Sequence, residues 1–164
     1  MELKPLSKDA IESAIAKAER YRLLNEPNEA ESICLDVLAI DPDNQPAQVM
    51  LLLALTDQIG EASGAASRAE QLAGRLASEY ERLYYSGIVA ERRARAHLSR
   101  GGAAAAGAYE WLTDALDYFE RAERVRPVGN DDAILRWNTC VRVLRQHPHL
   151  RPTGEEREEP QFLE

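Results

Sequence analysis

The segment EAESICLDVLAIDPDN (residues 29–44) is matched later in the chain by DALDYFERAERVRPVGN (residues 114–130). The aligned pairs are Ala30 with Ala115, Cys34 with Phe119, Val37 with Ala122 and Pro42 with Pro127. Spacings of four and three residues put the first three positions on one face of a helix, and the proline ends that helix. A segment that recurs in this way predicts an array of repeated helical units.

The rest of the chain also has helical spacing, and strand patterns are nearly absent. Proline and glycine separate the helical stretches, and Ser7 is expected to cap the first of them. The seven predicted helices cover about residues 8–24, 27–40, 46–59, 65–76, 78–98, 108–125 and 133–146. The connector Gly101–Gly107 is expected to be partly helical, and Asn130–Asp132 to cap the last helix.

The repeated pattern resembles the second half of a tetratricopeptide repeat (TPR). That pattern has a small residue, an aromatic four positions on, a small residue three further and a proline five further, and residues 114–130 match at every place. Ala18, Tyr21 and Gly87 fit places in the first half of the repeat. The resemblance covers about residues 8–146, with roughly 16 extra residues in the third hairpin relative to the usual period.

This resemblance implies an all-α fold, a TPR-like right-handed array of about three helical hairpins plus a C-terminal capping helix, about seven helices in all. An unrelated helical bundle is the alternative fold. We expect one repeat domain over residues 1–148 and an acidic, proline-containing tail over 149–164. The tail is either a binding motif, for example for a neighbour's groove at Arg92 and Arg136, or a solvated spacer.

Charge and composition narrow the function. The chain of 164 residues carries 20 Lys and Arg against 28 Asp and Glu, a formal net charge of -8, which argues against general nucleic-acid or anionic-membrane binding. The longest apolar run, residues 49–55, is too short to cross a bilayer, and the start lacks the apolar core of a leader peptide. Cys34 and Cys140 are expected to be reduced core residues. We therefore expect a cytoplasmic protein.

Enzymatic signatures are missing from the sequence. The glycine-rich Gly101–Gly107 follows a helix and lacks the lysine of a phosphate-binding loop, and His147 and His149 have no evident third metal ligand. The prediction is a protein that is not an enzyme and has no catalytic, cofactor-binding or metal-binding residues.

In TPR proteins a partner segment commonly lies in the groove lined by the first helix of each hairpin, so the resemblance implies a partner-binding face here. Tyr and Arg suit such a face because they offer amphipathic area and bidentate carboxylate recognition. The candidate residues are Arg22, Tyr84, Ile88, Glu91, Arg92, Arg95, Arg136 and Asn138.

The expected function is that of an adaptor that binds a protein or peptide segment, or a second copy of itself. Residues 9–61 contain eleven acidic and three basic residues, whereas residues 62–148 contain eleven acidic and thirteen basic residues. The alternative is therefore a helical-repeat RNA- or nucleotide-binding protein that uses the arginine-rich second half.

Overall fold

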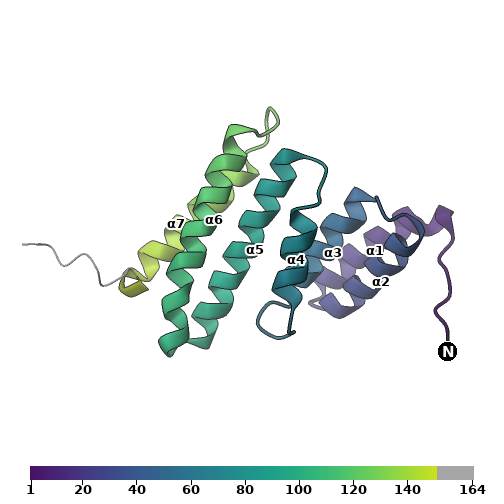
Figure 1. Ribbon diagram of the computed structural model, residues 1–164, viewed down its shortest axis with the longest axis horizontal. Helices are drawn as coiled ribbons and strands as arrows, with labels where there is room; N and C mark the ends of the chain where they lie inside the picture. Colours follow the sequence, from purple (N-terminus) through teal and green to yellow (C-terminus); the bar gives the residue numbers. More distant parts are fainter. Residues whose placement is uncertain (151–164) are drawn as a thin grey trace, which may run out of the picture.

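A computed structural model describes residues 1–150, without the side chains of residues 103, 104 and 106 (Figure 1). Over this range the chain is all-helical, as predicted, with seven α-helices and three short 3-10 helices. The α-helices are α1 (Ile11–Leu23), α2 (Pro27–Ile40), α3 (Gln45–Asp57), α4 (Ala65–Ala73), α5 (Glu79–Arg100), α6 (Ala106–Arg124) and α7 (Asp132–Gln146). The 3-10 helices are η1 (Lys8–Ala10), η2 (Gly102–Ala105) and η3 (Pro148–Leu150). The predicted tail lies almost wholly outside the described residues.

Polar side chains fix several helix starts. The Asn44 side chain accepts a hydrogen bond from the backbone N–H of Ala47 at 3.0 Å and so caps α3. Before α7, the Asn130 side chain accepts a bond of 2.9 Å from the N–H of Asp132. Ser7 occupies the predicted N-cap position of the first turn, but its side chain makes no capping hydrogen bond. That turn is a 3-10 turn, in which the carbonyl of Ser7 accepts from the N–H of Ala10.

Each helix packs mainly on its neighbours in the chain, and the odd-numbered helices also touch one another in order: α1 with α3, α3 with α5, and α5 with α7. Consecutive helices run in opposite directions (Figure 1), so the odd-numbered helices all run the same way. Their C-terminal ends therefore lie along one edge of the molecule. This shared edge brings together side chains that are far apart in the sequence.

The recurring sequence pattern lies in the core. The aligned residues before each proline are all fully or almost fully buried, namely Ala30, Cys34, Val37, Ala115, Phe119 and Ala122. One large cluster around Leu52 and Leu55 fills the space between α1 and α5, and a second around Leu112 and Phe119 joins α5, α6 and α7. Both clusters thus include residues of α5.

The third hairpin is elongated, as predicted, because α5 and α6 have 22 and 19 residues. At its far end the Tyr80 hydroxyl donates to the Asn130 side chain at 3.1 Å and ties α5 to the start of α7. The packed chain continues past the predicted domain end at residue 148, since Leu150 is only 7% exposed and η3 contacts α6 and α7.

Both cysteines are buried free thiols, as expected of core residues. Burial raises the pKa of Cys34 and of Cys140 to about 12. None of the helices described is both long enough and apolar enough to span a bilayer.

Candidate functional site

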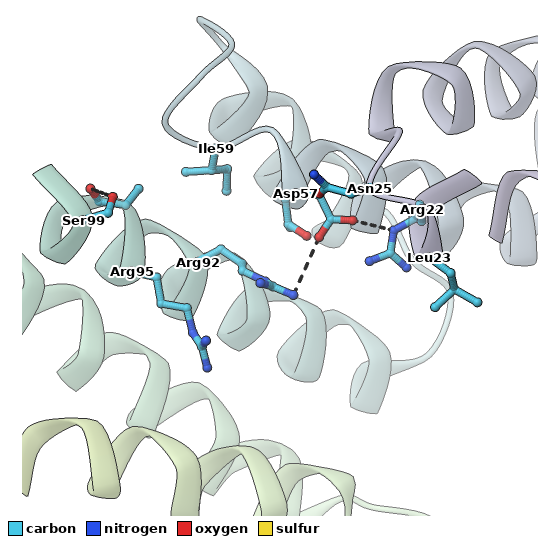
Figure 2. A pocket seen from close by; sticks show the side chains of 10 residues that line it. Arg22, Leu23, Asn25, Asp57, Ile59, Arg92, Arg95 and Ser99 are labelled. Carbon is cyan, nitrogen blue, oxygen red and sulfur yellow. Dashed lines mark hydrogen bonds and ion pairs between the residues drawn. The ribbon is translucent and has the colours of Figure 1, made fainter. Parts of the chain in front are cut away.

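A cavity of about 430 Å³ opens where the C-terminal parts of α1, α3 and α5 meet (Figure 2). Three separate stretches of the chain form its walls: the end of α1 and the turn after it, the end of α3, and the second half of α5. The lining residues are Arg22, Leu23, Asn25, Thr56, Asp57, Ile59, Arg92, Arg95, Ala96 and Ser99. The shared edge of the odd-numbered helices is therefore hollowed and carries three arginines.

Asp57 connects the three helices around this cavity. Its Oδ2 accepts a 2.8 Å hydrogen bond from Nε of Arg22, and its Oδ1 lies 3.7 Å from a terminal nitrogen of Arg92, as the dashed lines in Figure 2 show. Asp57 is the last residue of α3, where the partial negative charge of the helix end disfavours a carboxylate. The two guanidinium groups offset that cost and link α1, α3 and α5.

A second carboxylate, Glu91, lies on α5 and is only 1% exposed. Its Oε1 accepts two hydrogen bonds from Arg95, from Nε at 3.0 Å and from Nη2 at 2.7 Å. Its Oε2 is buried without a hydrogen bond and lies 3.6 Å from Nη1 of Arg136 on α7. Arg136 also hydrogen-bonds the side chain of Tyr84. Glu91 therefore holds the two arginines in place from below the surface.

These six side chains form what we call the charged row: Arg22, Asp57, Arg92, Glu91, Arg95 and Arg136. The row crosses all four odd-numbered helices and sets four guanidinium groups against two carboxylates. It is thus a locally cationic strip on a chain whose formal net charge is -8. Arg92 and Arg95 keep 33% and 45% of their side-chain surface exposed, so their remaining donors are open to a ligand.

The two less tightly paired arginines differ in how well their charge is compensated. Burial lowers the pKa of Arg92, and the distant Asp57 only partly offsets this effect. Burial also acts to lower the pKa of Arg136, but Glu91 and the hydrogen bond with Tyr84 outweigh it, and the net shift is upward. Of these two arginines, Arg92 is therefore the one whose charge is less fully compensated.

The structure brings together five of the eight residues predicted for the partner-binding face. Arg22, Arg92 and Arg95 line the cavity, while Glu91 and Arg136 adjoin it. The other three lie outside the cavity lining, although Tyr84 hydrogen-bonds Arg136 of the charged row.

Ile88 is 3% exposed and packs in the α5–α6–α7 cluster, so it belongs to the core and not to an open face. Tyr84 stacks on Tyr80 at 5.6 Å and is half-buried in an aromatic cluster with Phe119. Asn138 is half-buried on α7, outside the cavity lining.

Sequence reasoning missed Asp57, although it pairs with two of the predicted arginines. The available signal was a single acidic residue that ends an apolar helix and follows QPAQVMLLLALT.

The described residues hold no group of three or more His, Cys, Asp or Glu side chains arranged to bind a metal ion. The chemistry of the cavity is that of guanidinium donors facing water, which is suited to binding carboxylates or phosphates. Comparisons of the chain with protein-family models, with curated proteins and with solved structures found no match to any of them.

Proposed function

We propose that this protein is a TPR-like adaptor, without enzymatic activity, that binds an acidic segment of a partner protein along the face of its odd-numbered helices. The observation that carries the proposal is the charged row, in which four guanidinium groups face two carboxylates beside a cavity of about 430 Å³. Helical-repeat arrays bind extended partners along such faces. We place this adaptor in the cytoplasm.

An extended peptide with several carboxylates fits the row better than a small ligand does. Three of the four odd-numbered helices, α1, α5 and α7, carry Arg22, Arg92 and Arg136, so the cations are spread along the array. A guanidinium binds a carboxylate with two parallel hydrogen bonds, which gives orientation as well as affinity. Glu91 and Asp57 fix the arginine positions in advance, and this reduces the entropy lost on binding.

RNA or a nucleotide is the second candidate, because phosphate also binds guanidinium groups. One feature disfavours it. The residues that line the cavity include no aromatic ring on which a base could stack. The net charge of -8 also repels a nucleic acid with many phosphates more strongly than a short peptide with a few carboxylates.

The proposal is tested by fluorescence anisotropy with a labelled glutamate-rich peptide, the same peptide with glutamine in place of glutamate, and a labelled oligouridylate. Three full-length proteins are compared: the natural sequence, the variant Arg92→Glu and the control variant Arg124→Glu. Arg124 lies on the exposed surface of α6, and its substitution changes the net charge by the same amount. Arg92→Glu is expected to weaken binding of the acidic peptide by about tenfold, and Arg124→Glu to leave it nearly unchanged.

Because the acidic tail of the chain is itself a competitor, each binding curve is repeated with Glu155, Glu156, Glu158 and Glu159 changed to glutamine. Equal losses in Arg92→Glu and Arg124→Glu would show that only net charge matters. Tight binding of the oligouridylate with little binding of the acidic peptide would establish the nucleic-acid function instead.

A further inference from the structure

The charged row carries more positive charge than its own carboxylates neutralise. Four guanidinium groups share two carboxylates, and the Arg92 contact to Asp57 is long, at 3.7 Å. Burial lowers the pKa of Arg92, which indicates incomplete compensation of its charge. An anion placed in the cavity would contact Arg92 and the exposed side of Arg95.

The chain itself contains a segment with the complementary chemistry. Residues 151–164 read RPTGEEREEPQFLE, with five glutamates against two arginines. Four of the glutamates fall within Glu155–Glu159, at a spacing that presents several carboxylates along a short length of chain. Their charge is opposite to that of the row.

The fold places the start of this segment at the correct edge. Since α5 and α7 run the same way, the end of α7 lies on the same side of the molecule as the end of α5 (Figure 1). Arg95 and Ser99, which line the cavity, belong to that last part of α5. The last packed residue, Leu150, is held there by contacts of η3 with α6 and α7. The acidic run is thus attached on the same side of the molecule as the cavity (Figure 1).

The length of the connection is sufficient. Glu155 and Glu159 are five and nine residues beyond Leu150, which corresponds to at most about 17 and 30 Å of extended chain. Packed helices lie about 8–10 Å apart, so α5 is about one such spacing from α7, and α3 about two. The acidic run can reach the cavity from its own anchor.

Building on the proposed function, we infer that the acidic run Glu155–Glu159 binds the charged row of its own chain and competes with the acidic segment of the partner. Attachment to the same chain gives the run a high effective concentration, so even weak contacts compete well. A partner must then displace the run in order to bind. The acidic run thereby lowers the apparent affinity of the adaptor for its partner, so only a partner that outcompetes the run is bound.

The test uses full-length proteins and one probe, a fluorescein-labelled peptide with the sequence of residues 153–164. Its binding is measured for the natural sequence, for the tail-neutral variant E155Q/E156Q/E158Q/E159Q, and for that variant combined with Arg92→Glu or with the control Arg124→Glu. The tail-neutral variant is expected to bind the probe at least about fivefold more tightly than the natural sequence. Arg92→Glu should abolish this gain and Arg124→Glu should preserve it.

Three outcomes overturn the inference. Equal binding of the probe by the natural and tail-neutral proteins would show that the run does not occupy the row, and the adaptor function would survive if a foreign acidic peptide still bound. Absence of binding of either acidic peptide by the tail-neutral variant would remove both proposals. A dimer in light scattering that dissociates in the tail-neutral variant would assign the row to a second copy of the chain.

Discussion

A Cβ atom added to Gly87 in α5 would lie 2.6 Å from Cε1 of Phe119 in α6, well inside van der Waals contact. Phe119 is fully buried, and its Cδ1 and Cζ would also lie within 2.9 Å of that added Cβ. Glycine in the middle of a helix normally costs stability. Here it permits the close approach of the two longest helices.

The first prediction concerns this contact. Gly87→Ala improves helix propensity by about 1 kcal/mol but forces Phe119 to move, and overpacking of this kind costs about 1–3 kcal/mol. We expect a net loss of about 1 kcal/mol in the free energy of unfolding, measured by urea denaturation. Gly74→Ala is the control, because its added Cβ would meet only ordinary contacts of 3.7 and 3.8 Å. It should be neutral or mildly stabilising.

The second variant in the same experiment is Gly87→Ala with Phe119→Leu. If the clash causes the loss, the double variant is less destabilised than the sum of its single changes. If the loss of unfolding free energy in the double variant equals the sum of the two single losses, the Phe119 ring and Gly87 act independently.

Much of the fold could be predicted because the residues that end its helices are chemically distinctive. Pro27, Pro42 and Pro127 mark helix boundaries by steric exclusion, and the aligned small residues Ala30 and Ala115 mark the buried face. The limits of α4 to α6 were less accurate. Alanine favours a helix wherever it lies, so the residues of Gly101–Gly107 gave little indication that α6 begins at Ala106.

The candidate site was predictable only in part. Helical spacing correctly grouped Arg92 and Arg95 on α5, but it cannot distinguish an open face from the neighbouring core face, and Ile88 fell on the latter. Asp57 and Arg22 are 35 positions apart, and their pairing depends on how α1 and α3 pack. A contact of this kind requires tertiary structure.

The second prediction tests the buried carboxylate. Glu91→Gln keeps the shape of the side chain but removes the charge that holds Arg95 and Arg136. Because both guanidinium groups are partly hydrated, we expect a loss of about 1–2 kcal/mol in the free energy of unfolding and not the larger cost of a fully buried pair. The control is Glu120→Gln, whose exposed pair with Arg124 should contribute under about 0.5 kcal/mol.

The third prediction is a pH dependence set by the buried thiols. Their pKa is raised from 9.0 to about 12 in the folded protein, so the folded state keeps two protons that the unfolded state loses above pH 9. Stability is therefore fully present below about pH 9 and falls as the pH rises towards 12. Urea denaturation at about pH 8 and about pH 10.5 measures the fall.

The double variant Cys34→Ala with Cys140→Ala should show a smaller fall over the same interval. Tyr80 and Tyr85, whose pKa values burial raises to about 12, account for a remaining part of it. Parallel profiles for the two proteins would contradict the assignment to the thiols.

The fourth prediction uses Asp57 to separate two roles of the charged row. On the proposed function, Asp57 occupies the same guanidinium groups that an acidic segment binds, so Asp57 both links α1, α3 and α5 and competes with that segment. In the tail-neutral background, Asp57→Asn should raise the affinity for an acidic peptide by about threefold and lower stability by under about 1 kcal/mol, the range of a partly exposed ion pair. The control Asp117→Asn makes the same change of net charge at an exposed pair with Arg121 on α6. An equal gain in both variants would mean that the peptide responds to overall charge, whereas a gain confined to Asp57→Asn would locate its carboxylates at Arg22 and Arg92.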